Sequence, residues 1–275
     1  MRFFLLIIIS ISIFAKTPYS VLESEHNKAV KLWENGKNIE AFSIFKKNNE
    51  ENYIPSKYYI GLYYLYGFNT VKISYSKAFD YINDSSETGY INAMLQNSIL
   101  YYYGIGTVKD KTKAKRILNK IALYFNMFDE TSKSYLITIR KFNFTFLGVK
   151  LKKTRVLLKE SIKSKNRLSK VNLIFYLRTH PYFFRRFTEA TSILKEELKK
   201  GNVEAQALFY EQYSIKKRAL KFLLAAAKQG DVNSQYNLYL HYKRKKNKRK
   251  KIKWLRIAAN NGDKTARRIL RRSRY

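Results

Sequence analysis

Side chains that could perform acid–base, nucleophilic or metal chemistry are few and far apart in this sequence. The three histidines are His26, His180 and His241, and no two of them have a metal-ligand spacing. Glu196 and Glu197 are adjacent, so they point to different sides of a helix and cannot act as a catalytic carboxylate pair. The absence of cysteine excludes disulfides, thiolate metal sites and a cysteine nucleophile. We therefore expect no catalytic residue, no metal and no cofactor, and we predict that the protein is not an enzyme.

Positive charge is the strongest chemical feature of the chain. The formal net charge is +35, and the segment from Asn126 to Tyr275 holds 39 basic and 10 acidic residues. Eight of the nine residues from Lys243 to Lys251 are basic. Such a cluster can neutralise several phosphates or adhere to an anionic membrane, and the alternative is a solvated loop without a partner. The predicted anion-binding residues are Lys243, Arg244, Lys245, Lys246, Lys248, Arg249, Lys250 and Lys251.

The N-terminus resembles an export signal. Arg2 precedes an uncharged apolar run from Phe3 to Ala15, which has the length of a signal-peptide core and is short for a membrane span. We expect cleavage after Ala15. Because Ile13 is not a small residue, an uncleaved anchor formed by residues 3–15 is the alternative. Export would place the protein in a periplasm, outside the cell or in the endoplasmic-reticulum lumen.

A repeated helical pattern runs through the rest of the chain. The 10 glycines and 3 prolines are too few for an all-β fold, which needs frequent turns. The pattern is clearest over residues 93–122, where Gly104 and Gly106 end one helix and allow positive φ in the turn. Asp110 can cap a second helix, and Ala114 begins its buried face.

The spacing of such helix pairs predicts the architecture. A small residue early in each second helix recurs at steps of 37, 36, 76 and 29 residues. The longest step fits two units with the missing marker near Thr154, and a last marker falls at Lys251. About seven antiparallel helix hairpins therefore fit the chain, and neighbours must stack to cover their apolar faces. The small markers are Ala41, Ala78, Ala114, Ala190 and Ala219. We predict an all-α repeat solenoid.

The repeat signature resembles that of a known family. The full pattern is carried by Ala93, Tyr101, Gly104, Gly106, Asp110, Lys113, Ala114 and Ala122. Residues 222–230 and 254–262 match its second half, with an aromatic residue, an Ala-Ala pair and a glycine in register. The pattern resembles the Sel-type (suppressor-enhancer-of-lin-like) repeat of the tetratricopeptide superfamily. The match is clear over 54–122 and 201–266, weak over 26–50 and nearly absent over 126–200.

This resemblance implies a right-handed superhelix with a concave groove that holds other proteins. Exported bacterial relatives resemble periplasmic or host-directed interaction proteins. Relatives in the endoplasmic reticulum are adaptors of a membrane ubiquitin ligase, and a minority have been linked to cell-wall chemistry. Tyr64 and Tyr101 occupy the packing position of the signature and are expected in the core. The tyrosines off that position are predicted to line the groove, with core packing as the alternative: Tyr59, Tyr63, Tyr66, Tyr102 and Tyr103.

These observations together predict four segments. Residues 1–15 are the signal peptide or anchor, 22–125 are N-terminal Sel-type repeats, 126–200 are divergent helical repeats, and 201–275 are basic C-terminal repeats. We expect an exported protein-interaction adaptor that binds a protein segment in its groove. The alternatives are a binder of an anionic polymer, membrane surface or nucleic acid through the basic half, and a cell-wall-related enzyme.

Overall fold

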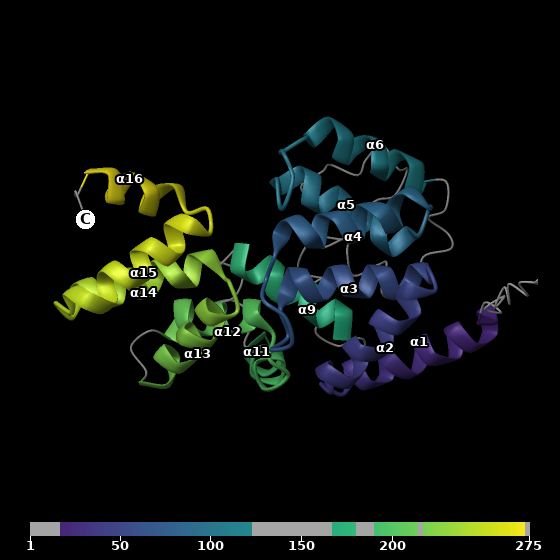
Figure 1. Cartoon of the computed structure of the whole chain (residues 1–275), viewed down its shortest axis with the longest axis horizontal. Helices are drawn as coiled ribbons and strands as arrows, with labels where there is room; N and C mark the ends of the chain where they lie inside the picture. The colour runs from purple at the N-terminus through teal and green to yellow at the C-terminus, as the bar shows by residue number, and fades with distance from the viewer. Residues whose placement is uncertain (1–16, 123–166, 180–189, 214–216, 273–275) are drawn as a thin grey trace, which may run out of the picture.

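A computed structural model describes residues 17–122, 167–179, 190–213 and 217–272 of the chain. The described residues form thirteen helices and contain no strand, which confirms the predicted all-α class (Figure 1). No helix in these segments is both long enough and apolar enough to cross a membrane. The predicted signal segment and the marker near Thr154 lie outside the described residues.

The helices fall into an N-terminal group, a middle pair and a C-terminal group (Figure 1). The N-terminal group contains α1 (Tyr19–Glu34), α2 (Asn38–Glu50), α3 (Ile54–Tyr66), α4 (Tyr75–Glu87), α5 (Ile91–Tyr103) and α6 (Lys111–Ala122). The middle pair consists of α9 (Arg167–Thr179) and α11 (Ala190–Lys199). The C-terminal group contains α12 (Val203–Tyr213), α13 (Lys217–Lys228), α14 (Val232–Arg244), α15 (Lys248–Asn260) and α16 (Lys264–Arg272).

Consecutive helices pack as hairpins, and each hairpin also contacts the next one. The helices of the pairs α1–α2, α3–α4, α5–α6, α12–α13 and α14–α15 pack against each other, and α2–α3, α4–α5 and α13–α14 join neighbouring pairs, with α4–α5 as extensive as α12–α13. The predicted small markers are fully buried in the second helices: Ala41, Ala78, Ala114, Ala190 and Ala219. A small side chain at these positions lets neighbouring helices approach closely, so the repeat spacing read from the sequence is confirmed at each of them.

The turn between α5 and α6 shows how the sequence ends one helix and begins the next. Gly104 ends α5 in the left-handed conformation, with φ of 72° and ψ of 43°. Gly106 has φ of 71° and lies against the Tyr75 carbonyl so closely that a Cβ atom would clash. The Asp110 carboxylate accepts a hydrogen bond of 2.8 Å from the Lys113 amide and caps α6. These features confirm the predicted roles of both glycines and of the aspartate.

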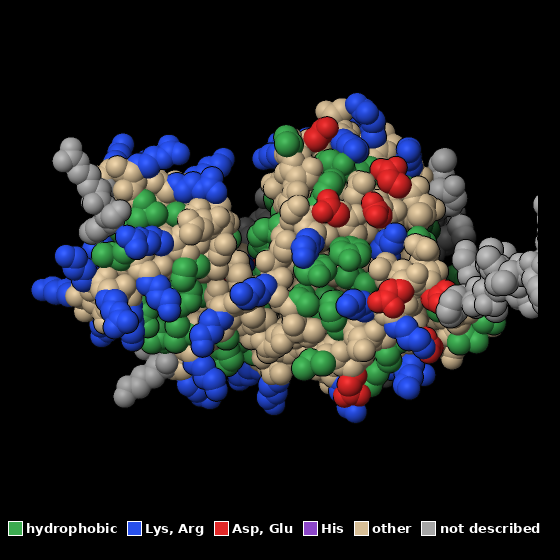
Figure 2. All heavy atoms as spheres, in the orientation of Figure 1, with side chains coloured by type: hydrophobic (Ala, Val, Ile, Leu, Met, Phe, Trp, Pro, Cys, Tyr) green, Lys and Arg blue, Asp and Glu red, His purple; other side chains and the backbone are tan. Residues whose placement is uncertain are grey.

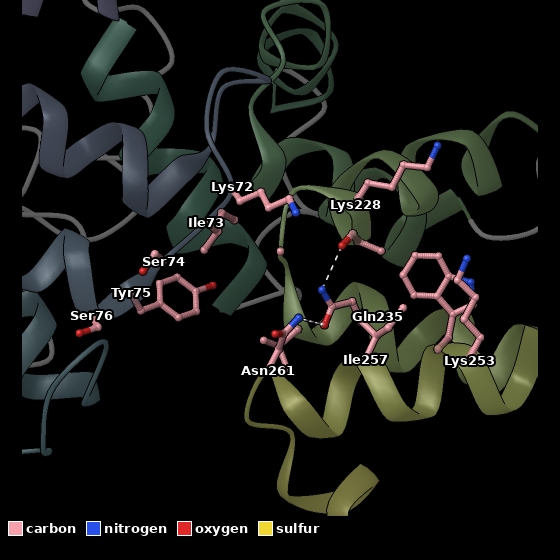
Figure 3. Close-up of a pocket in the computed structure, with 14 residues that line it drawn as sticks. Lys72, Ile73, Ser74, Tyr75, Ser76, Lys228, Gln235, Lys253, Ile257 and Asn261 are labelled. Atoms are coloured by element: carbon pink, nitrogen blue, oxygen red, sulfur yellow. Dashed lines mark hydrogen bonds between the residues drawn. The ribbon is translucent and has the colours of Figure 1, made fainter. Parts of the chain in front are cut away.

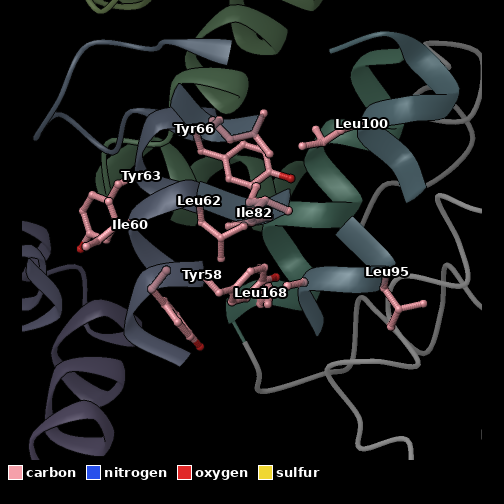
Figure 4. Close-up of a cluster of buried hydrophobic side chains, with 14 of the residues drawn as sticks. Tyr58, Ile60, Leu62, Tyr63, Tyr66, Ile82, Leu95, Leu100 and Leu168 are labelled. Atoms are coloured by element: carbon pink, nitrogen blue, oxygen red, sulfur yellow. The ribbon is translucent and has the colours of Figure 1, made fainter. Parts of the chain in front are cut away.

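An aromatic core fills the N-terminal group and extends to the middle pair (Figure 4). Trp33, Phe45 and Tyr58 are fully buried in it, and Leu168 of α9 packs against the same cluster. Because α9 comes after the segment outside the description, this contact joins the N-terminal group to the rest of the chain. A separate core around Leu255 fills the C-terminal group.

Arg167 fixes α9 to the N-terminal group. Its side chain is 1% exposed, and its guanidinium donates to the Trp33 carbonyl and, at 2.8 Å, to Asn38 Oδ1. The guanidinium carbon lies 4.6 Å from the centre of the Trp33 ring. Glu197 of α11, itself 0% exposed, supplies the countercharge at 3.4 Å. Burial favours the neutral form of this carboxyl and raises the pKa of Glu197, although Arg167 opposes that shift.

Arg178 fixes α9 to the C-terminal group. Its guanidinium donates at 2.7 Å to Glu204 of α12 and at 2.8 Å and 3.0 Å to the two carboxylate oxygens of Asp231, which caps α14. Glu211 accepts a further hydrogen bond at 3.2 Å. Burial opposes the ionisation of Asp231, but Arg178 and the Ser234 groups outweigh it and lower the pKa of Asp231. One arginine therefore connects three helices of the repeat array.

Candidate groove between distant repeats

The connection between α3 and α4 reaches across the molecule and rests on the C-terminal group. Its Asn69 amide donates to Gln229 Oε1 at 2.7 Å, over a sequence separation of 160 residues. Asn69 Oδ1 accepts from Gln206 Nε2 at 3.3 Å, and Gln229 Nε2 donates to Gln206 Oε1 at 3.0 Å. The Ile73 amide donates to the Gln229 carbonyl. This amide network brings repeats from the two halves of the chain into direct contact.

A groove of about 650 Å³ lies beside this contact (Figure 3). One wall is the end of the α3–α4 connection and the first turn of α4, and the opposite wall is formed by α13, α14 and α15. The lining residues are Lys72, Ile73, Ser74, Tyr75, Ser76, Ala227, Lys228, Gly230, Val232, Gln235, Lys253, Trp254, Ile257 and Asn261. The volume falls within the range of about 300–1,000 Å³ that is usual for ligand sites.

The groove combines an apolar surface with a fixed pair of amide side chains. Ile257 of α15 presents part of the apolar surface (Figure 3), and Trp254, which is 8% exposed, also lines the groove. Gln235 Nε2 donates to the Ala227 carbonyl at 3.0 Å, and Asn261 Nδ2 donates to Gln235 Oε1 at 2.9 Å. These hydrogen bonds hold both amides in place before any ligand arrives, which reduces the entropy cost of binding.

The charge of the groove is positive. Lys72, Lys228 and Lys253 are exposed at its edges, and no acidic residue is among its lining residues. Tyr75 lies near the buried Arg178 cluster, and burial, Glu204 and Asp231 raise the pKa of Tyr75 well above its ordinary value. Tyr75 is therefore neutral, and the three ammonium groups determine the charge that a ligand meets.

The predicted tyrosine groove is wrong at three of its five positions. Tyr59, Tyr63 and Tyr66 are 9%, 0% and 1% exposed and belong to the aromatic core. Tyr63 donates to the Asn38 carbonyl at 2.7 Å, and the ring of Tyr59 stacks on Phe45 with centres 4.6 Å apart. Helix α3 is enclosed by its neighbours on nearly all sides, so tyrosines off the signature position are buried too.

The other tyrosine predictions have mixed outcomes. Tyr102 and Tyr103 are partly exposed at the end of α5, and their binding role stays a prediction. Tyr101 is buried as predicted, at 7% exposure. Tyr64 is only half-buried and stacks on Tyr81, with the ring centres 5.7 Å apart.

The basic run lies where the sequence placed it, at the turn from α14 to α15. Residues 243–250 are exposed, and Lys251 is partly buried. Lys246 adopts a positive φ of 53°, and Asn247 caps α15 by accepting from the Lys250 amide at 3.0 Å. Figure 2 shows basic side chains over the C-terminal group and a mixture of signs over the N-terminal group. Anion binding by this turn stays a prediction.

The described histidines are buried or partly buried, and the adjacent glutamates Glu196 and Glu197 each pair with basic residues. His26 is 7% exposed among aromatic rings, and His241 is partly buried near Arg244; His180 lies outside the description. Glu196 bonds to Lys170 and Lys200 while Glu197 faces Arg167, so the adjacent glutamates point apart as predicted. The described segments contain no group of three or more His, Asp or Glu side chains that could hold a metal ion.

The repeat pattern predicts neither the groove nor the two buried arginines. The groove is built from residues about 160 positions apart, and a repeat pattern predicts contacts only between neighbouring units. Arg167 and Arg178 lie in the segment where the signature is nearly absent. The few acidic residues in this strongly basic region, among them Glu197, Glu204 and Asp231, are the sequence signal that could have pointed to buried ion pairs.

The fold defines a class: a helical repeat protein built from stacked antiparallel hairpins. The chain is similar to the structure of c5321, a protective antigen of uropathogenic Escherichia coli strains that displays an SLR fold, with 19% identity, a TM-score of 0.40 and coverage of 94% of this chain and 68% of that one. It is also similar to a Sel1 repeat protein from Oxalobacter formigenes, with 18% identity, a TM-score of 0.40 and coverage of 86% and 99%. Both neighbours carry the description of the family that the repeat signature resembles. No family model and no curated protein sequence matches the chain.

Proposed function

We propose that the protein is an exported, non-catalytic interaction scaffold that holds a segment of another protein. The observation that carries this proposal is the groove of about 650 Å³ between the α3–α4 connection and helices α13–α15. Its described lining offers apolar, amide, hydroxyl and cationic groups, and the Ser74 hydroxyl caps α4 by accepting from the Lys77 amide. The carboxylates of Glu204 and Asp231 are engaged by Arg178 and are not among the lining residues, so the groove offers no pair for the cell-wall enzyme alternative.

Site-specific photo-crosslinking tests this function in the native host. A crosslinking amino acid at Ile257 lies in the groove, and the same amino acid at Lys120, which is exposed on α6, is the matched control. We expect one partner segment to be captured at Ile257 only, and the purified partner to stay bound above about 0.5 M salt, where exposed charge pairs are screened. Equal capture at both positions, or complete loss of the purified complex in salt, would contradict a groove-based scaffold.

A second candidate function is the binding of an anionic polymer by the basic turn of α14–α15. The specific observation is that eight basic residues from Lys243 to Lys251 gather at the turn and the adjoining ends of α14 and α15, and all but Lys251 are exposed. Replacing these residues with serine should abolish retention on an anionic polymer and reduce the salt dependence. Unchanged retention on a heparin column would end this hypothesis.

Export is a separate part of the proposal and has its own test. The apolar run from Phe3 to Ala15 supports it. Fractionation of a C-terminally tagged protein, with the mass of its mature N-terminus, should show a chain beginning at Lys16 on the far side of a membrane. A full-length chain in the cytosolic fraction would contradict export.

A further inference from the structure

We infer that the segment held in the groove is acidic, with carboxylate side chains on both sides of an apolar residue. The inference rests on the proposed function and specifies the chemistry of the partner. Three observations support it: the sign of the charge at the groove, the distribution of that charge, and the position of the apolar surface.

The sign of the charge selects an anionic partner. Among the described residues that line the groove, Lys72, Lys228 and Lys253 carry the charge. All three lysines are exposed, and the salt bridges within the described segments involve other residues. Like charges around one concavity repel each other, and a ligand with complementary charge relieves that repulsion.

The distribution of the charge favours a peptide over a single phosphate group. The three lysines come from the α3–α4 connection, the end of α13 and the middle of α15, and their ammonium groups point in different directions (Figure 3). At the start of α14 the Ser234 amide already donates to the Asp231 carboxylate at 2.6 Å, so this amide is not available to a bound phosphate. A compact phosphate needs donors that converge on one point. Carboxylates spaced along an extended chain can each approach a separate lysine.

The apolar surface lies among these charges. Ile257 of α15 lines one wall of the groove and Ile73 lies on the opposite wall (Figure 3). Trp254, three residues before Ile257, also lines the groove, although its side chain is only 8% exposed. The Gln235–Asn261 amide pair lies beside them and can hydrogen-bond to a peptide backbone. An apolar side chain of the partner would therefore sit against Trp254, while its acidic neighbours extend towards the lysines.

Two fluorescein-labelled peptides of eight residues test the inference on the full chain by fluorescence polarisation. The first has glutamate at six positions and leucine at two, and the second replaces every glutamate with glutamine. The groove variant Lys72→Ser/Lys228→Ser/Lys253→Ser is compared with the turn variant Lys243→Ser/Lys245→Ser/Lys246→Ser, which removes the same charge elsewhere. Three exposed ion pairs at about 0.5 kcal/mol each predict about tenfold weaker binding of the acidic peptide by the groove variant. The turn variant should bind it like the wild type.

The outcomes separate the acidic-segment inference from the proposed scaffold function. An equal loss in both triple variants, or no binding of either peptide by the wild type, would overturn the inference. If the glutamine peptide binds as well as the acidic one and Ile257→Asp weakens both, the groove holds protein segments without regard to charge. In that case the inference fails and the proposed function stands. As an independent readout, the fluorescence emission of Trp254 should shift when the acidic peptide binds. The measurement uses a Trp33→Phe variant, in which Trp254 is the remaining tryptophan.

Discussion

Protonation of His26 should destabilise the N-terminal hairpins as the pH falls. The imidazole is 7% exposed, its Nδ1 shares a hydrogen bond of 3.0 Å with Ser56 Oγ, and its ring contacts Phe45, Tyr53 and Tyr59 at centre distances of 5.3–5.4 Å. Burial among these rings disfavours the charged form and lowers the pKa of His26 from 6.5 to about 4.

The sign and size of the effect follow from linkage. Between pH 4 and 6.5 the unfolded chain binds a proton that the folded chain does not, so stability is lost as the pH falls through this window. With these two pKa values, the free energy of unfolding should fall by about 2 kcal/mol between pH 7 and pH 5.

Urea unfolding at pH 7, 6 and 5 measures this loss. The fluorescence of Trp33 in a Trp254→Phe background reports on the N-terminal group, because the Trp33 ring contacts Tyr59 at 5.4 Å and Tyr59 contacts His26. His26→Phe should remove about 2 kcal/mol of pH dependence, whereas His241→Gln, in the C-terminal group, should leave the Trp33 transition unchanged. The same pH slope in His26→Phe and in the wild type would refute the reasoning.

Three further predictions test the packing that positions the groove. Arg178→Met should lower stability by about 3–5 kcal/mol, because it leaves three carboxylates without their arginine, and thermal unfolding by circular dichroism measures the change. Gly106→Ala should lower the free energy of unfolding by about 1–3 kcal/mol, because the added methyl group meets the Tyr75 carbonyl in a positive-φ turn. Urea unfolding measures this loss, and an unchanged free energy of unfolding would contradict the tight contact. Arg167→Met should be strongly destabilising alone, and the added change Glu197→Leu should recover much of the stability; a double variant no more stable than Arg167→Met would argue against a buried ion pair.

The sequence predicts the parts of this molecule that depend on local rules. Small residues at a regular spacing, glycines in turns and Asp110 as a helix cap each act within one hairpin, and the structure confirms them. Whether a tyrosine faces inwards depends on what covers its helix from the other side. Tyr63 is fully buried because α2 of the preceding hairpin covers its ring, and its hydroxyl donates to the Asn38 carbonyl there. The signature position does not encode this contact.

The parts that depend on contacts between distant repeats could not be predicted. The amide network of Asn69, Gln206 and Gln229 joins segments about 160 residues apart, and nothing in the composition of either segment marks the pairing. Buried charges such as Arg167 and Arg178 look like ordinary surface residues in a chain with a net charge of +35. The basic turn could be located because its charge density is unusual even for this sequence.

The most direct test of the account is whether the two halves of the chain meet at the groove in solution. Lys72 and Lys228 flank the backbone hydrogen bond from Ile73 to Gln229, and the chain has no cysteine of its own. A Lys72→Cys/Lys228→Cys variant treated with a short bismaleimide should form an intramolecular crosslink at any protein dilution. Crosslinking no greater than in a Lys120→Cys/Lys228→Cys control would contradict the groove and the scaffold function built on it.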